Sequence, residues 1–288
     1  IKIDGNPKQC YINPREGAIG CFEEACRNVV CTGAKPIGML DHLQFGNPND
    51  PEIFWTFLES LKGLTDFAKD FEIPCVGGKV SLYNETSDGP IKPTPVIGVI
   101  GLIDKKPLKI QKINSGDSLI MVGDTKDELG GSEYSEYIHK FIGGKCPAVD
   151  FSESKKNMNS VLDAIENELI KSAHDCSKGG LSIAISELCM INQIGCNISL
   201  EKIPGEKLDS DKILFSESHS RYLLTIENKN LSKLEETMKK HNVSYSLIGE
   251  FTGDSICFTG DSKPIIDLSV DKAQKTWYNS LKEMVLHA

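Results

Sequence analysis

Hydrophobic and polar positions in the first hundred residues follow two helical periods and three short apolar runs. In the segment 17–33, apolar residues recur every three or four positions, which predicts a helix that ends at Gly33. The same spacing predicts an amphipathic helix over 51–71. The short runs predict buried strands at 36–43, 73–76 and 95–103. Strands and helices therefore alternate in this part of the chain.

The alternation continues to the other end of the chain. Helices are predicted at 154–172, 181–192 and 231–241, and strands at 117–123, 222–226 and 255–259. Between the two parts, residues 104–115 are polar, rich in lysine and interrupted by Pro107, which indicates a domain boundary. We therefore expect an α/β (α+β) fold in two domains. Residues 1–107 would form an N-terminal domain of sheet plus helices, and 108–288 a second α/β sheet-and-helix domain.

Charge and composition narrow the class of protein. The 288 residues include 32 Lys and Arg against 41 Asp and Glu, a net charge of -9. A general nucleic-acid-binding protein would carry a basic face, so we expect no nucleic-acid partner. No apolar run approaches the ~20 residues that span a bilayer, so we expect no membrane partner.

The ten cysteines show neither a C-x-x-C pair nor metal-finger spacing. We therefore expect free, mostly buried thiols in a reducing compartment, which predicts a cytoplasmic protein. The chain opens on Ile1-Lys2-Ile3-Asp4 without an initiator methionine. We interpret that start as the end of a strand and the chain as part of a longer protein.

Two glycines, Gly77 and Gly78, precede a dense polar run, KVSLYNET. Glycines let a backbone approach a ligand closely, and exposed N–H groups in such a loop can form an anion nest. The Lys79 charge suits a phosphate, and Ser81 can form hydrogen bonds. The spacing is neither that of a P-loop nor that of a dinucleotide-binding fingerprint. A plain turn is the alternative, and on spacing alone the commoner one.

Asp41 stands at the predicted carboxyl end of a buried strand, where open α/β sheets bind ligands. Its carboxylate could bind Mg²⁺ or a nucleotide hydroxyl. Alternatively, it only caps the following turn.

The segment AHDCSKGGL leads into a predicted helix. Ser177 is a candidate N-cap, Asp175 would lie near the helix N-terminus, and a Gly-Gly turn into a helix can bind phosphate. Adjacent residues rarely form a catalytic triad, so we do not expect Cys176 to be a nucleophile.

Glu24 and Asn28 are spaced i, i+4, which places both on one helix face. Together they could hold a metal through oxygen ligands, or they could belong to an ordinary polar face. The segments ELGGSEY and FSESHSR are further loops that could contact phosphate or the neighbouring domain.

Taken together, these segments resemble the synthetase subunit of phosphoribosylformylglycinamidine synthase. GGKVSLYNET is similar to that family's GGNVSLYNET, and LDHLQFGNP to its D-x-L-N-F-G-N-P stretch. EEACRNVVCTGAKPIG, AHDCSKGGL and LFSESHSRYL resemble three further segments, in the family's order and over nearly the whole chain. The match is to the second of the family's two repeated halves. It implies a domain like the N-terminal domain of aminoimidazole ribonucleotide synthetase, followed by a second α/β domain.

The resemblance also implies an activity, that of an ATP-dependent carbon–nitrogen ligase of purine biosynthesis. ATP phosphorylates the amide oxygen of formylglycinamide ribonucleotide. Ammonia then displaces the phosphate to give formylglycinamidine ribonucleotide. The implied cofactors are ATP and Mg²⁺, and the implied partners are a glutaminase subunit and a small bridging subunit. The family's catalytic histidines lie in the other half, so we expect no catalytic residue here and no activity from this chain alone.

The implied site residues fall into two groups. Asp41 and Gly78 match ATP positions, and Ser81 matches a substrate position. Lys79 stands where many members have an asparagine that binds Mg²⁺. An ammonium group cannot ligate a cation, so we expect Lys79 to contact phosphate directly. The second group matches residues that hold an auxiliary nucleotide and its Mg²⁺. Ser177 matches a position that contacts this nucleotide, and the positions that hold its Mg²⁺ match Glu24, Asn28 and Asp175.

Two other functions stay open. This half could be a non-catalytic structural module that only holds the auxiliary nucleotide. It could also be a homodimeric relative such as aminoimidazole ribonucleotide synthetase, selenophosphate synthetase or a thiamine phosphate kinase, although GGKVSLYNET and FGNP disfavour these. Because the family's halves pair pseudosymmetrically, we expect an exposed apolar surface that the missing N-terminal half or a second copy covers.

Overall fold

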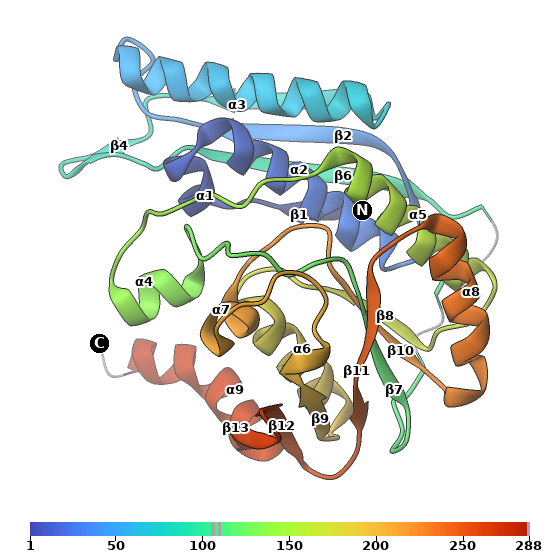
Figure 1. The fold of residues 1–288 in the computed structure, drawn as a ribbon. Helices are drawn as coiled ribbons and strands as arrows, with labels where there is room; N and C mark the ends of the chain where they lie inside the picture. The colour runs from blue at the N-terminus through green and yellow to red at the C-terminus, as the bar shows by residue number, and fades with distance from the viewer. Residues whose placement is uncertain (105–106, 109–110, 287–288) are drawn as a thin grey trace.

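Four strands form the smaller of two main sheets (Figure 1). The computed structural model describes residues 1–104, 107–108 and 111–286. The strand order is β1–β6–β2–β3, with β2 and β3 parallel and the other neighbours antiparallel. The strands are β1 (Lys2–Asp4), β2 (Lys35–Gln44), β3 (Cys75–Ser81) and β6 (Thr94–Leu102).

The helices that accompany this sheet are α1 (Pro7–Ile12), α2 (Pro14–Val30) and α3 (Pro51–Asp70). Each begins at an asparagine or aspartate followed by proline, a strong start signal. The Asn13 side chain accepts a hydrogen bond from the Glu16 backbone N–H at 3.1 Å, and Asp50 accepts one from Glu52 at 2.8 Å. Helix α2 packs against β6 and alongside α3, so one face of the sheet is covered.

The opposite face of the small sheet is open. Along β6, Ile97 and Val99 are buried toward the helices, because alternate side chains of a strand point to opposite faces. On the open face Ile3 is 69% exposed, Leu40 38% and Leu102 51%. This face therefore carries an apolar surface of the kind expected for pairing.

Seven strands form the larger sheet, in the order β13–β12–β9–β11–β7–β10–β8. The central strands β7 and β10 are apolar without alternation because both faces of the sheet are buried. Ile120 and Leu224 belong to one core, and Leu119 and Leu223 to the other. The strands are β7 (Ser118–Val122), β8 (Ser172–Asp175), β9 (Cys196–Ser199), β10 (Tyr222–Ile226), β11 (Tyr245–Phe251), β12 (Ser255–Gly260) and β13 (Lys263–Ser269).

Helices cover both faces of the larger sheet. Those that contribute to one core are α5 (Phe151–Glu166) and α8 (Leu231–His241). Those that contribute to the other are α6 (Gly180–Asn192), α7 (Ser210–Phe215) and α9 (Val270–Leu286). The first of these cores also contains Phe22 and Val29 of α2, so apolar packing continues from the large sheet to the small one. The remaining elements are α4 (Glu133–His139), the hairpin β4 (Glu85–Thr86) and β5 (Gly89–Pro90), and short 3-10 turns at Leu200–Lys202 and Asn228–Asn230.

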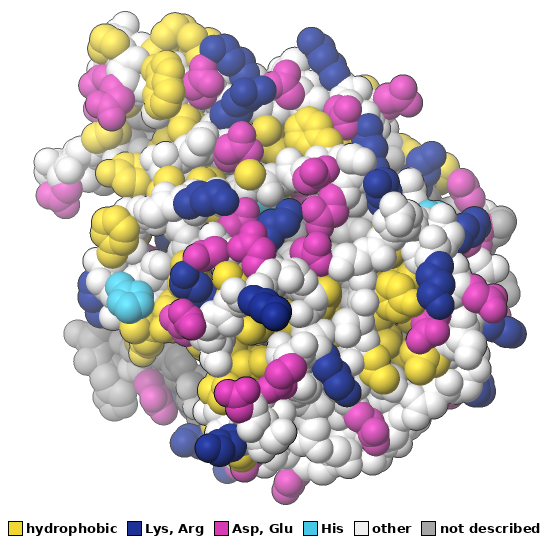
Figure 2. Space-filling view, in the orientation of Figure 1, with side chains coloured by type: hydrophobic (Ala, Val, Ile, Leu, Met, Phe, Trp, Pro, Cys, Tyr) yellow, Lys and Arg dark blue, Asp and Glu magenta, His cyan; other side chains and the backbone are white. Residues whose placement is uncertain are grey.

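Hydrophobic side chains also gather on the surface over the start of α3, at the upper left of Figure 2. Phe54 is 44% exposed, Trp55 53% and Leu58 38%. This patch lies on a helix and is separate from the open face of the small sheet.

The predicted mixture of helices and sheets is confirmed, and several boundaries differ. The helix predicted over 17–33 begins earlier, at Pro14, and ends at Val30. The helix predicted over 154–172 ends at Glu166, because Glu168 has a positive φ of 54° and Ser172 already begins β8. Within the predicted boundary stretch 104–115, residues 105–106 and 109–110 lie outside the described residues.

All ten cysteines are free and most are buried, as expected. In the described ranges, no helix combines the length and the apolar character needed to cross a membrane.

Candidate functional site

Asp41 and Gly78 face each other on the neighbouring strands β2 and β3. A Cβ atom on Gly78 would collide with the Asp41 carboxylate, so the missing side chain leaves room for that carboxylate. Burial raises the pKa of Asp41, and the nearby Cys75 thiol and the Lys79 backbone amide oppose that rise. The result is a half-buried carboxylate at the edge of the sheet.

Strand β3 continues through both glycines to Ser81, so the predicted loop at Gly77-Gly78 is wrong. Both glycines pair with β2 in the parallel ladder, and neither has a positive φ. An anion nest requires successive N–H groups in a turn. Here those groups are committed to an extended strand, so this segment forms neither a nest nor a plain turn.

The pleat of the two strands divides the predicted residues between the faces of the sheet. Asp41 and Gly78 share the helix-covered face with buried Leu43. Lys79 and Ser81 are the alternate residues and lie on the open face. Ligand groups are therefore available on both sides of the β2–β3 edge, at the carboxyl ends of two parallel strands.

The loops that follow β2 and β3 are fastened to each other. The Asn84 side-chain amide donates to the carbonyl of Phe45 at 3.0 Å and to that of Ser81 at 2.9 Å. The Tyr83 N–H donates to the Gly46 carbonyl at 2.9 Å, with Tyr83 at a φ of 61°. Such strain in a non-glycine residue persists only where surrounding bonds hold it. These bonds are the structural reason for the FGNP and SLYNE segments, and they fix the position of Ser81.

A second polar cluster surrounds the buried guanidinium of Arg27 on α2. The guanidinium pairs with Glu23, and it lies 3.5 Å from carboxylate oxygens of both Glu24 and Asp175. It also donates to the Cys176 carbonyl at 3.2 Å. Glu24 and Asp175, predicted as a pair from separate motifs, are thus brought together by Arg27, which the sequence did not single out.

Asp4, at the carboxyl end of β1, is a further member of this cluster that sequence reasoning missed. Its Oδ2 atom is buried without a hydrogen-bond partner. Burial raises the pKa of Asp4, and burial together with the Asp4 charge raises that of Glu24. In the sequence, Asp4 is marked only by its position at the end of the alternating run Ile1-Lys2-Ile3-Asp4, which is too short to indicate a site.

Asn28 does not join the carboxylates. Its side-chain amide donates to the Glu24 backbone carbonyl at 3.0 Å, within the same helix. Across the described part of the chain, no three His, Cys, Asp or Glu side chains are grouped so as to hold a metal. The carboxylates of Glu24 and Asp175 thus lie around the Arg27 guanidinium, and in the described residues they form no coordination shell.

The prediction that Ser177 is the N-cap of α6 is wrong. The N-cap is Gly179, with a φ of 77°, and no side chain caps it from the segment itself. Instead, the Glu217 carboxylate accepts from the Gly179 N–H and from the Glu133 N–H, both at 2.8 Å. Glu217, from the FSESHSR segment, thus supplies a hydrogen-bond acceptor at the start of two helices.

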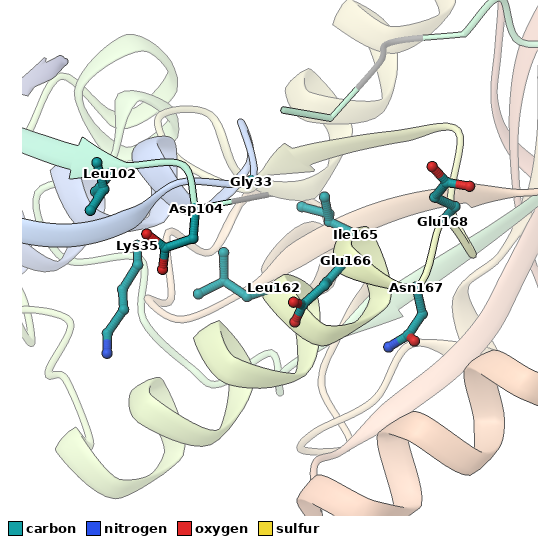
Figure 3. Close-up of a pocket in the computed structure, with 9 residues that line it drawn as sticks. All are labelled: Gly33, Lys35, Leu102, Asp104, Leu162, Ile165, Glu166, Asn167 and Glu168. Carbon is teal, nitrogen blue, oxygen red and sulfur yellow. The ribbon is translucent and has the colours of Figure 1, made fainter. Parts of the chain in front are cut away.

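A cavity of about 470 Å³ lies at the other end of β2 (Figure 3). Lys35 and Asp104 line one side, and Glu166 and Asn167 at the end of α5 line the other. No predicted site residue lines it, and six residues of strand, about 20 Å, separate Lys35 from Asp41. We therefore place the candidate site at the β2–β3 edge and not in this cavity.

The chain matches two family models. AIR synthase related protein, N-terminal domain, matches residues 1–103, and AIR synthase related protein, C-terminal domain, matches residues 114–259.

Among curated proteins, the chain is similar to phosphoribosylformylglycinamidine synthase subunit PurL of Methanocaldococcus jannaschii. The two are 40% identical over 293 residues, which cover 99% of this chain and 39% of the relative. The corresponding subunit of Thermococcus sibiricus is 38% identical over 287 residues, with 98% and 39% covered. The chain thus spans about two fifths of the length of these relatives, and the resemblance seen in its motifs is confirmed.

Solved structures from Thermotoga maritima share the fold. PurL complexed with FGAR has a TM-score of 0.80 at 21% identity, covering 95% of this chain and 45% of that one. PurL complexed with ATP has a TM-score of 0.77 at 19% identity, covering 95% and 43%. The PurLQS structure has a TM-score of 0.75 at 20% identity, covering 94% and 44%.

Proposed function

Since this chain belongs to the AIR synthase related protein family, we propose that it is half of a phosphoribosylformylglycinamidine synthase synthetase, an ATP-dependent carbon–nitrogen ligase of purine biosynthesis. The observation that carries the proposal is the register of β2 and β3, which places Asp41 against Gly78 and Ser81 at the adjoining strand end. The chain supplies ATP and formylglycinamide ribonucleotide contacts, and the acid–base groups lie outside it. Alone it is inactive as a ligase.

Each residue of the β2–β3 edge has a distinct part in this proposal. Asp41 accepts hydrogen bonds from the nucleotide, and Gly78 lets the nucleotide approach the strand. Lys79 contacts phosphate and offsets charge on the transferring phosphoryl group, which is the main task of a protein in such reactions. Ser81, held by Asn84, positions the ribonucleotide substrate.

Mg²⁺ and an auxiliary nucleotide belong to the Arg27 cluster. Carboxylate oxygens are the donors that Mg²⁺ takes, and the unpartnered Asp4 oxygen would gain a partner from a bound cation. Because the carboxylates are not grouped for a metal in the described chain, Glu24 and Asp175 would have to move together around the ion, and Asn28 would have to release its helix carbonyl to join them. Ser177 would donate its hydroxyl to phosphate. The ion supplies charge neutralisation for that phosphate when bound.

The partners in this proposal follow from the open sheet face and from the relatives. The missing N-terminal half, or a second copy, covers the apolar side chains of the open face. A glutaminase subunit delivers ammonia, and a small bridging subunit joins it to the synthetase. Residues 1–107 and 108–288 form the two domains, and the free cysteines fit a cytoplasmic location.

The test is titration calorimetry of the complete protein with ADP, on wild type, Asp41→Ala and Asp175→Ala. Loss of a charge-assisted hydrogen bond should weaken ADP binding about tenfold or more in Asp41→Ala. With ATP, formylglycinamide ribonucleotide and ammonia as substrates, Asp41→Ala should also form ADP more slowly than the wild type. Loss of binding only in Asp175→Ala would favour the alternative of a half that merely holds a nucleotide. Absence of nucleotide binding in the wild type would overturn the proposal.

A further inference from the structure

The open face of the small sheet carries a row of basic side chains beside the candidate site. On this face His42 of β2 is in register with Lys79 of β3, and Gln44 with Ser81. On the other side of β2, His42 is in register with Val96 and Gln44 with Thr94 of β6. Residues in register share a face and have neighbouring Cβ atoms. His42 and Lys79 are therefore direct neighbours at the carboxyl ends of the parallel strands.

Polarity changes along this face. Toward the start of β2 it is apolar, with exposed Leu40 and Ile3, and glycines flank Leu40 on both sides. Toward the end of β2, the next two rows are polar apart from Val96 and contain no carboxylate. The apolar end suits protein pairing, whereas the polar, acid-free end suits an anion. The two ends of one face thus have separate uses.

Among the described residues, no hydrogen bond or ion pair occupies the His42 Nε2 atom or the Lys79 ammonium group. The Nε2 atom of His42 is buried and forms no hydrogen bond. Lys79 is exposed and pairs with none of the acidic groups in the described ranges. Asp41 lies on the opposite face. A buried polar atom without a partner costs free energy and often marks a place where a ligand binds.

We propose that His42 and Lys79 form an anion subsite that holds a phosphoryl group directly, in place of a divalent cation at position 79. The Lys79 ammonium and an imidazole N–H are both donors to phosphate oxygens. Neither matches the oxygen ligands that Mg²⁺ requires. This inference rests on the proposed function and adds two points to it: His42 contacts the phosphoryl group, and no metal binds at position 79. The phosphoryl group can come from ATP or from the ribonucleotide substrate.

The experiment measures ligand affinity of the complete protein in EDTA and in Mg²⁺, with ATP, ADP and formylglycinamide ribonucleotide titrated separately. The variants are Lys79→Asn, Lys79→Arg, His42→Ala and the double variant His42→Ala with Lys79→Asn. Lys62→Asn on α3 is the charge-matched control, because its side chain is 63% exposed and lies outside the site. Thermal melting verifies that each variant is folded.

In EDTA, Lys79→Asn should weaken binding about tenfold, because a charge-assisted hydrogen bond is lost. Mg²⁺ should restore it, because the asparagine oxygen can ligate a cation. Lys79→Arg should bind like the wild type. His42→Ala should weaken binding severalfold, and its effect should shrink in the double variant, since both residues contact one group. An effect with ATP but not ADP assigns the terminal phosphoryl group, and an effect only with the ribonucleotide assigns its phosphate.

Two results would overturn the subsite while leaving the proposed function intact. One is wild-type affinity of Lys79→Asn for every ligand in EDTA, while Asp41→Ala still loses nucleotide binding. The other is a wild type that loses binding in EDTA as fully as Lys79→Asn does. Failure of the wild type to bind any nucleotide in either condition would instead overturn the proposed function.

Discussion

At the scale of single residues, Gly78 shows how a missing side chain can define a site. The three atoms nearest to an alanine Cβ at this position all belong to the movable Asp41 carboxylate, so the strand itself can persist. We expect Gly78→Ala to keep its melting temperature within a few degrees and to bind ADP about tenfold more weakly, because Asp41 must rotate away. Calorimetry and thermal melting measure the two effects.

Gly77→Ala is the matched control for this prediction. A Cβ there would lie 3.8 Å from Leu40, an ordinary contact, and would point to the other face of the sheet. Equal losses of affinity in the two variants would mean that any added methyl group disturbs β3, and that Gly78 has no special relation to Asp41.

Glu217 predicts a pH dependence of stability. Burial raises the pKa of Glu217 to about 7, above the ordinary 4.5. Folding therefore favours the protonated carboxyl. Its contribution to the free energy of unfolding is complete below pH 4.5 and is lost as the pH rises through 7. The difference is roughly 3 kcal/mol in the free energy of unfolding.

The variant Glu217→Gln isolates this contribution, because an amide oxygen can still accept from Gly179 and Glu133 but does not titrate. Urea denaturation at pH 5 and pH 8 should show that the wild type loses stability relative to the variant as the pH rises. A constant difference between the two proteins at both pH values would contradict the assignment.

At the scale of elements, the sequence predicts boundaries that depend on local signals better than boundaries that depend on pairing or on shared packing. The start of α3 is written locally, in an Asp50-Pro51 cap followed by a long apolar stripe. The extent of β3 is not, because Gly77-Gly78 has low strand propensity, and only pairing with β2 keeps it extended. The sequence also misplaces the end of α5, because the apolar residues after it belong to a core shared with other segments.

The residues of the candidate sites also divide into those that a sequence motif indicates and those whose role depends on packing. Asp41, Gly78, Glu24 and Asp175 were predicted from motifs, but their grouping depends on register and on packing between distant elements. Arg27, Asp4 and Glu217 carry no local signal of their role. Their meaning arises only when α2, β1 and the 216–221 loop meet β8 and α6.

Arg27 joins α2 to β8, and its removal should be costly. Without the guanidinium, Glu23 would be a fully buried charge that keeps the hydroxyl groups of Ser154 and Ser220 and lies 3.7 Å from the His219 imidazole. Breaking a buried pair by removing one partner typically costs about 3–5 kcal/mol. We expect Arg27→Ala to lower the free energy of unfolding by that amount in urea denaturation.

Arg15→Ala provides the comparison on the same helix. Its ion pair with Asp66 is half exposed, with side-chain exposures of 49% and 43%, so its loss should change stability by less than about 1 kcal/mol. Similar losses in the two variants would show that burial of the Arg27 cluster does not set its contribution.

At the scale of the whole molecule, the open face of the small sheet predicts association of the chain 1–288. Ile3, on the edge strand β1, is 69% exposed and belongs to an apolar surface that favours a partner over water. For the chain 1–288 in isolation, a second copy is the available partner, so sedimentation velocity should show a dimer that dissociates on dilution. Ile3→Lys should sediment as a monomer, because pairing would bury its charge. Trp55→Lys, which places the same charge at a 53% exposed position on α3, should leave the dimer unchanged. A monomeric wild type would contradict the predicted association, and a dimer broken only by Trp55→Lys would move the pairing surface from the open sheet face to α3.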